Sequence, residues 1–167
     1  MDRRRFLQWG VGGIGAAALA VIARAQQNVV AMTLPPPTPT FKLSDAQWLR
    51  RLGPQRYAVL RQAATEPPFS SPLDHEHRHG IYRCAGCALP LFSSEHKFDS
   101  GTGWPSFWRP LMANAITTDT DTSLMMVRTE VRCRRCASHL GHVFDDGPPP
   151  TGLRYCINGL ALDFTPA

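Results

Sequence analysis

Hydrophobic and polar positions follow different patterns in successive parts of the chain. An uncharged stretch over residues 9–23 comes first, and a proline-rich segment over residues 26–41 follows it. A helical pattern then runs over residues 44–64, after which short strand-like runs alternate with Gly, Pro and Asp turns. The pattern predicts a small, mostly β domain over residues 42–166 with helices at its N-terminal end.

The helical part has a recognisable start and an internal break. Ser44 and Gln47 match a capping box, in which each side chain accepts a hydrogen bond from the other residue's backbone N–H. Gly53-Pro54 interrupts the helix, and Pro54 suits the first position of a second helical run. Strands are expected over residues 80–83, 116–118, 124–131 and 160–164.

The first 25 residues have the composition of an export signal. Arginines at positions 3–5 precede Phe6-Leu7 and the uncharged stretch, and Ala23-Arg24-Ala25 offers an A-x-A cleavage site. We therefore predict a twin-arginine signal over residues 1–25, a linker over residues 26–41 and a periplasmic mature protein. The glycine-interrupted apolar stretch is short and makes a poor permanent membrane span. We therefore expect no stable membrane span once the signal is removed, whereas an uncleaved signal would anchor the protein to the membrane.

The positive charge of the chain belongs partly to this signal. Removal of residues 1–25 takes away four arginines and one aspartate, so the net charge falls from +5 to +2. The remaining basic residues form no cluster of the kind that nucleic-acid binding requires. We expect no nucleic-acid partner, and we expect a monomer.

The cysteines divide into two pairs and a single residue. Cys84 and Cys87 form one CxxC pair, and Cys133 and Cys136 form another. Two such pairs in a chain of short strands predict four thiolates around one structural zinc ion, with no open coordination position for catalysis. Iron in the same site, two disulfides or a redox dithiol are the alternatives.

Cys156 lies outside both pairs and is the candidate nucleophile. Residues 145–152 have turn composition, so the chain would fold back and bring His139 and His142 towards the thiol as proton donors or bases. Arg154 would hold the thiol partly as thiolate through its charge.

Two aromatic residues and an amide complete the candidate site. Trp104 lies between Gly103 and Pro105, a loop context in which a core ring is less expected. Phe107 is a core residue or a ligand-binding one, since buried aromatic residues are usually core. Asn158 would donate a hydrogen bond to a ligand or fix a loop.

Taken together, these motifs resemble the methionine-R-sulfoxide reductases, the B-type enzymes. The likeness runs over residues 43–164 and is carried by residues 84–87, 89–92, 98–107, 130–136, 139–144, 146–148 and 150–158. The resemblance implies a mainly β fold of two small antiparallel sheets with a short N-terminal helical segment, stapled by a four-cysteine zinc site. It also implies a thiol-dependent oxidoreductase that reduces the R epimer of methionine sulfoxide, peptide- or protein-bound, to methionine.

The resemblance also assigns roles to individual residues. Cys156 matches the nucleophile, which passes through a sulfenic acid, and Trp104 matches the ring that receives the substrate's methyl group, with Phe107 assigned beside it. The polar pocket corresponds to His139, His142, Arg154 and Asn158, and the zinc ligands to Cys84, Cys87, Cys133 and Cys136. The implied partners are oxidised proteins or peptides and an external thiol reductant such as a thioredoxin-like protein.

Two positions depart from the family pattern. Gly159 replaces the serine that commonly follows the asparagine, and Thr102 stands where many relatives carry the resolving cysteine. With no spare thiol, the sulfenic acid would have to be reduced directly by the external donor. Two rival hypotheses are a non-catalytic zinc-ribbon-like binding module with Cys156 as a structural thiol, and a disulfide oxidoreductase that uses one CxxC pair.

Overall fold

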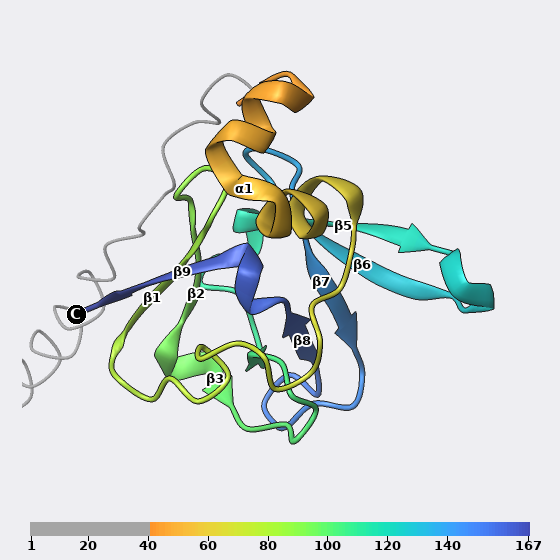
Figure 1. Ribbon diagram of the computed structural model, residues 1–167. Helices are drawn as coiled ribbons and strands as arrows, with labels where there is room; N and C mark the ends of the chain where they lie inside the picture. The colour runs from red at the N-terminus through yellow and green to blue at the C-terminus, as the bar shows by residue number, and fades with distance from the viewer. Residues whose placement is uncertain (1–40) are drawn as a thin grey trace, which may run out of the picture. The chain divides into compact units, whose positions relative to one another are not determined.

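The computed structural model describes residues 41–167, which contain one helix and two antiparallel β-sheets (Figure 1). The expected export signal over residues 1–25 and the linker up to residue 40 lie outside the described residues. Within residues 41–167, no helix combines the length and the apolar character that crossing a membrane requires.

Helix α1 (Asp45–Gln62) has the expected capping box at its start and the expected break at Gly53-Pro54. Gln47 Oε1 accepts from the Ser44 backbone N–H at 2.8 Å, and Ser44 Oγ accepts from the Gln47 N–H at 3.4 Å. Gly53, with φ 71° and ψ 168°, breaks the helix immediately before Pro54. This left-handed φ costs glycine little, so the helix can bend there while both of its halves pack against the domain.

The two sheets confirm the mainly β fold. The smaller sheet has the order β2 (Pro90–Ser93), β1 (Gly80–Cys84), β9 (Leu162–Pro166). The larger sheet has the order β3 (Lys97–Phe98), β4 (Ser106–Phe107), β8 (Arg154–Ile157), β7 (His139–Phe144), β6 (Arg128–Cys133), β5 (Ile116–Asp121). Four 3₁₀ turns connect the described strands: η2 (Ser94–His96), η3 (Ala113–Ala115), η4 (Ser123–Met125) and η5 (Gly159–Ala161).

Aromatic rings join the two sheets in the core. Phe107 of β4 stacks on Phe92 of β2, with ring centroids 4.5 Å apart, and meets Tyr82 of β1 edge-on at 4.9 Å. All three side chains are completely buried. Burial of each such ring stabilises the fold by about 1.5–3 kcal/mol, so this cluster is a principal contact between the sheets.

Two expected strands begin later than the sequence pattern predicts. Strand β6 starts at Arg128, because Leu124 and Met125 adopt φ values of 55° and 56° in the exposed turn that closes the β5–β6 hairpin. This hairpin projects to the right in Figure 1. Strand β9 starts at Leu162, after η5. In both places a tight turn takes residues that alternation alone would place in a strand.

Candidate active site and metal centre

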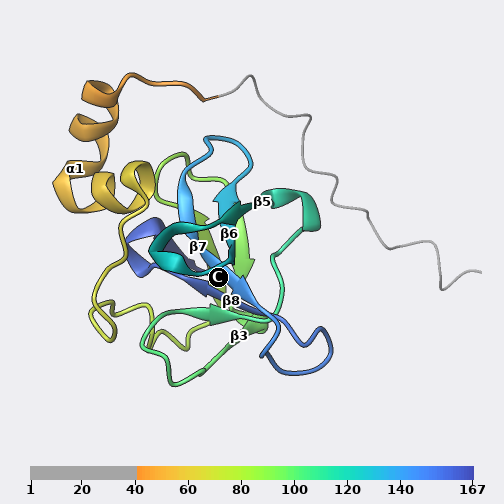
Figure 2. The same cartoon turned by 90° about the vertical axis from the view of Figure 1, so that its right-hand side faces the viewer.

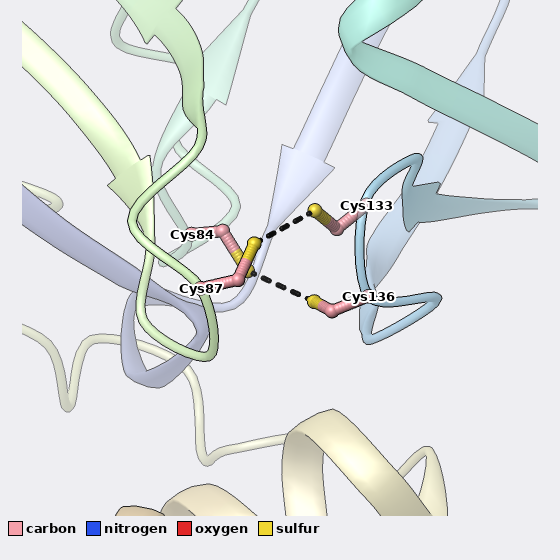
Figure 3. A group of neighbouring side chains, drawn as sticks. All are labelled: Cys84, Cys87, Cys133 and Cys136. Carbon is pink, nitrogen blue, oxygen red and sulfur yellow. Dashed lines mark hydrogen bonds between the residues drawn. The ribbon is translucent and has the colours of Figure 1, made fainter. Parts of the chain in front are cut away.

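The sulfur atoms of the two CxxC pairs converge on one point (Figure 3). All four lie within 4.8 Å of one another, and the Cys84–Cys136 and Cys87–Cys133 sulfur pairs are each 3.6 Å apart. Zinc–sulfur bonds of about 2.3 Å in a tetrahedron separate the sulfurs by roughly 3.8 Å. The four buried thiols therefore fit a tetrahedral metal ion, and they are positioned to form a metal site.

The metal site joins the two sheets, because one pair follows β1 and the other follows β6. Helix α1 contacts both turns: Arg51 Nε donates to the Gly86 carbonyl at 2.8 Å, and Arg61 Nη1 donates to the Cys136 carbonyl at 3.0 Å. The guanidinium carbon of Arg61 lies over the Trp48 ring, 4.8 Å from the ring centroid. The helix thus fixes the backbone of both cysteine turns.

Strand register brings the remaining thiol and an imidazole together. Cys156 of β8 pairs with His142 of β7 on one side and with Ser106 of β4 on the other. Glu130 of β6 pairs with His142, so these side chains form a row across one face of the sheet. The predicted return of the chain through residues 145–152 is confirmed (Figure 2).

A pocket of about 130 Å³ opens above this row. It is lined by Thr65, Trp104, Arg128, Gly141, His142, Phe144, Cys156 and Asn158. Of the residues predicted from the sequence, the structure brings Cys156, His142, Trp104 and Asn158 to the wall of this pocket. A thiol, an imidazole and an indole therefore share one small cavity.

The environment of Cys156 is less favourable to a thiolate than the sequence suggests. Burial raises the pKa of this thiol above its ordinary value, and this outweighs the hydrogen bond from Thr102 and the positive charge of Arg154, which both lower it. Thr102 Oγ1 lies 3.9 Å from the sulfur. Arg154 thus acts on the thiol in the predicted direction, although burial has the larger effect on its pKa.

His142 is held by a carboxylate. Its Nε2 lies 2.7 Å from Oδ2 of Asp121, and the same oxygen accepts from Arg128 Nη2 at 2.6 Å. Hydrogen bonds from Ser123 and then from His142 hold the pKa of Asp121 well below its usual range, so Asp121 is ionised. An ionised partner at Nε2 fixes the orientation of the His142 ring.

His139 occupies a different environment from His142. Its Nδ1 lies 2.6 Å from Oε1 of Glu130, its Nε2 is buried without a hydrogen-bond partner among residues 41–167, and its ring centre is 5.5 Å from that of His142. Burial lowers the pKa of His139, whereas Glu130 opposes this. His139 is neutral and is not among the residues that line the pocket.

Arg154 lies beside the thiol and is held by two other groups. It makes two hydrogen bonds to Asp146, of 2.9 and 2.8 Å, and its guanidinium lies 4.5 Å from the centre of the Phe144 ring. The ion pair with Asp146 offsets part of the positive charge that Arg154 presents to Cys156.

Asn158 fixes a loop. Its Oδ1 accepts from the Glu66 N–H at 3.0 Å and its Nδ2 donates to the Leu140 carbonyl at 3.1 Å. Both ends of the buried amide are therefore engaged within the protein. Of the two roles expected for Asn158, the structure supports loop fixation.

Phe107 is buried in the core and does not line the pocket, so the structure gives no support to its expected part in substrate binding. Its neighbour Ser106 pairs with Cys156, whereas Phe107 pairs with Tyr155. Successive side chains of a strand point to opposite faces, which directs Phe107 into the core against Phe92.

Gly159 has a steric reason to differ from the usual serine. A Cβ atom at this position would overlap the side chain of Ser71. Ser71 therefore occupies the space into which a side chain at position 159 would extend, and its Oγ accepts a hydrogen bond from the Leu73 N–H at 3.2 Å.

Four charged residues around the site were not predicted from the sequence: Glu66, Asp121, Arg128 and Glu130. Glu130 stands in the stretch that carries the family resemblance, which was the available signal. Asp121 and Arg128 precede and follow the hairpin turn, where nothing local indicates contact with His142. Glu66 lies in a proline-rich segment whose partners are far away in the chain.

Comparison with known proteins places the chain in a family. The SelR domain family matches residues 52–166. A peptide methionine sulfoxide reductase MsrB from Thioalkalivibrio sulfidiphilus is 60% identical over 126 residues, covering 75% of this chain and 92% of that protein. Proteins of the same name from Thiobacillus denitrificans (58% over 123 residues; 74% and 93%) and Agrobacterium fabrum (52% over 129 residues; 77% and 96%) are also similar. Because the family match spans most of the chain, the protein belongs to the SelR domain family.

Proposed function

We propose that this protein reduces the R epimer of methionine sulfoxide, in peptides and proteins, to methionine. The observation that carries the proposal is the pocket in which Cys156, separate from the metal site, faces His142 and Trp104. The relatives support the same activity, since they are named peptide methionine sulfoxide reductase. A non-catalytic zinc module would leave this arrangement without a purpose.

In the proposed reaction, the sulfur of Cys156 attacks the sulfoxide sulfur as thiolate while protonated His142 donates a proton to the sulfoxide oxygen. The bond between the two sulfurs and the sulfur–oxygen bond of the substrate then break, while the hydroxyl oxygen bonds to the Cys156 sulfur and leaves it as a sulfenic acid. The methionine sulfur gains two electrons and Cys156 loses two. Thiol and sulfoxide thus become sulfenic acid and thioether with all atoms accounted for.

The resting protonation states suit this order of events. Burial raises the pKa of Cys156, so the free enzyme keeps the thiol proton at neutral pH. Transfer of that proton to His142, which Asp121 supports, would generate thiolate and imidazolium together. The same proton then reaches the sulfoxide oxygen, so the step requires no other acid.

Epimer choice would follow from three fixed contacts around the substrate sulfur. The Trp104 ring offers an apolar surface for the methyl group, His142 offers a donor to the oxygen, and Cys156 requires a line of approach to the sulfur. The opposite epimer would exchange the positions of oxygen and methyl, and so place the oxygen against the ring.

We propose that the four-cysteine site holds structural zinc. The fit of the sulfur separations and the burial of the four thiols support this assignment. A site closed by four thiolates leaves no coordination position for substrate, so zinc would stabilise the fold and take no part in the reaction.

Activity on separated epimers tests the proposed function. Wild-type protein, supplied with excess dithiothreitol, should reduce an R-sulfoxide peptide and leave the S-sulfoxide peptide unchanged. Chromatographic separation of peptide and product measures the reaction. Equal rates on the two epimers would contradict the proposed stereochemistry, and no reduction of either would contradict the activity.

We propose that the catalytic cycle uses a single cysteine and an external thiol reductant, such as a thioredoxin-like protein. The other four thiols converge on the metal site, and position 102 is threonine. One turnover without reductant should leave Cys156 as a sulfenic acid, detectable as a dimedone adduct by mass spectrometry. An intrachain disulfide with metal release would contradict this prediction.

Thr102→Cys offers the matched variant. Thr102 Oγ1 already lies 3.9 Å from the Cys156 sulfur, so a cysteine there is within reach of a disulfide. We expect one turnover of this variant to give an internal disulfide in place of the dimedone adduct. Thr102→Ser, which adds no thiol, should behave as the wild type.

We also propose that the mature protein acts in the periplasm as a monomer, after twin-arginine export and removal of residues 1–25. The composition of those residues supports export. A metal site filled before translocation would suit a signal that carries folded cargo, because its thiols would be protected from oxidation.

A further inference from the structure

We propose that Glu66 is a positioning residue of the active site, whose carboxylate anchors the segment that orients Trp104 and Asn158. This inference rests on the proposed function. Glu66 lies three residues beyond the end cap of helix α1, and its side chain is directed to chain positions 159 and 160. It therefore joins two distant parts of the chain directly beside the pocket.

The backbone of Glu66 holds two pocket residues at once. Its carbonyl accepts a hydrogen bond from the indole Nε1 of Trp104 at 3.1 Å. Its N–H donates to Oδ1 of Asn158 at 3.0 Å. Both partners line the pocket, so a shift of this one residue would disturb two of its walls.

The carboxylate of Glu66 fixes that backbone in place. Oε1 accepts from the Gly159 N–H and Oε2 accepts from the Leu160 N–H at 2.9 Å. These amides follow directly after Asn158. The side chain and the backbone of Glu66 thus form a closed set of contacts with residues 158–160, which a side chain without two acceptor oxygens cannot reproduce.

Burying a carboxylate at this position costs desolvation free energy, which an apolar side chain of similar size would not. Glu66 is 4% exposed, and no cation pairs with it among residues 41–167. Burial raises its pKa, while the two backbone N–H groups lower it by favouring the ionised form. A buried carboxylate matched to two amides indicates a positional requirement.

The steric arrangement around Gly159 agrees with this role. A side chain at position 159 would overlap Ser71 and approach Oε1 of Glu66. Glycine therefore lets its own N–H come close to the carboxylate. Gly159 is therefore both the residue that replaces the family's usual serine and the residue whose N–H bonds to the Glu66 carboxylate.

Steady-state kinetics on an R-sulfoxide peptide test the proposal, with Glu66→Gln and Glu66→Ala compared with wild type. The carboxamide of glutamine accepts from one amide and turns its NH₂ group towards the other. We expect KM to rise about tenfold in the Gln variant and more in the Ala variant, with a smaller change in kcat. Glu66 positions the walls that bind the substrate and does not contact the reacting sulfur atoms, so its loss weakens binding more than it slows the chemical step. Glu95→Gln, an exposed acid, serves as the control and should match the wild type.

A double-mutant cycle separates positioning from simple stability. Trp104→Phe removes the indole N–H that bonds to the Glu66 carbonyl. If Glu66 acts through Trp104, Glu66→Gln should raise KM much less in the Trp104→Phe background than in the wild type. Equal KM effects in both backgrounds, or unchanged kinetics in Glu66→Gln with wild-type activity intact, would overturn the proposal.

The remaining outcomes are also decisive. If the Ala variant fails to fold, the Gln variant, which keeps the volume and one acceptor, carries the test. Failure of both to fold with metal bound would give Glu66 a purely structural role and overturn the proposal. An inactive wild type would instead overturn the proposed function, and with it this role.

Discussion

Replacement of Cys156 by serine should abolish sulfoxide reduction, with a loss in kcat/KM on the order of 10⁴-fold or more. Cys156 is separate from the four thiols of the metal site and faces His142 in the pocket. A serine hydroxyl keeps almost the same shape but is far less nucleophilic than a thiolate. Metal content and the thermal unfolding curve should therefore stay unchanged, which absorption spectrometry and circular dichroism measure.

Ser106→Ala is a matched control for this change. Ser106 pairs with Cys156 across the β4–β8 ladder, and its hydroxyl is engaged with Ser100 and the Trp104 carbonyl. The control removes a polar atom next to the nucleophile and should keep measurable turnover. Substantial turnover by Cys156→Ser itself would remove Cys156 from the role of nucleophile.

Loss of one metal ligand should unfold the domain. Cys84→Ser or Cys136→Ser is expected to lose the metal and the cooperative thermal transition together. Structural zinc contributes about 10 kcal/mol or more of binding free energy, which is comparable to the whole stability of a small domain. The site also connects turns that follow β1 and β6, so its loss removes one of the connections between the two sheets. Metal analysis and circular dichroism on the same samples check the result.

Ser138→Ala provides the comparison for the ligand variants. Ser138 Oγ lies 3.2 Å from the Cys136 sulfur but contributes no thiolate. This variant should retain its metal and melt within a few degrees of the wild type. Metal-free Cys136→Ser protein with a native melting curve would contradict the structural role of the site.

The sequence predicts those parts of the site that depend on local spacing. The two CxxC pairs, the return of the chain that pairs His142 with Cys156, and the capping box of α1 were all expected. Each CxxC pair, the capping box and the turn over residues 145–152 depend on residue types within a few positions of one another. These features can therefore be predicted from local sequence alone, without knowledge of the rest of the fold.

Long-range contacts could not be predicted in this way. Glu66 acts on Gly159 and Leu160, and nothing near Glu66 in the sequence marks those partners. Phe107 shows the same limit: its orientation depends on the register of β4 against β8, which decides which of two neighbouring side chains faces Cys156. The balance of burial against charge at Cys156 also depends on the whole surrounding fold.

The threonine beside Cys156 has a consequence for the way the enzyme would fail under severe oxidation. A neighbouring thiol condenses with a sulfenic acid and so shields it, but the hydroxyl of Thr102 cannot do so. When reductant is scarce and peroxide abundant, oxidised Cys156 is exposed to conversion into sulfinic acid, which ordinary thiols do not reverse. In the proposed single-cysteine cycle, the supply of reductant would therefore limit the working lifetime of each molecule as well as its rate.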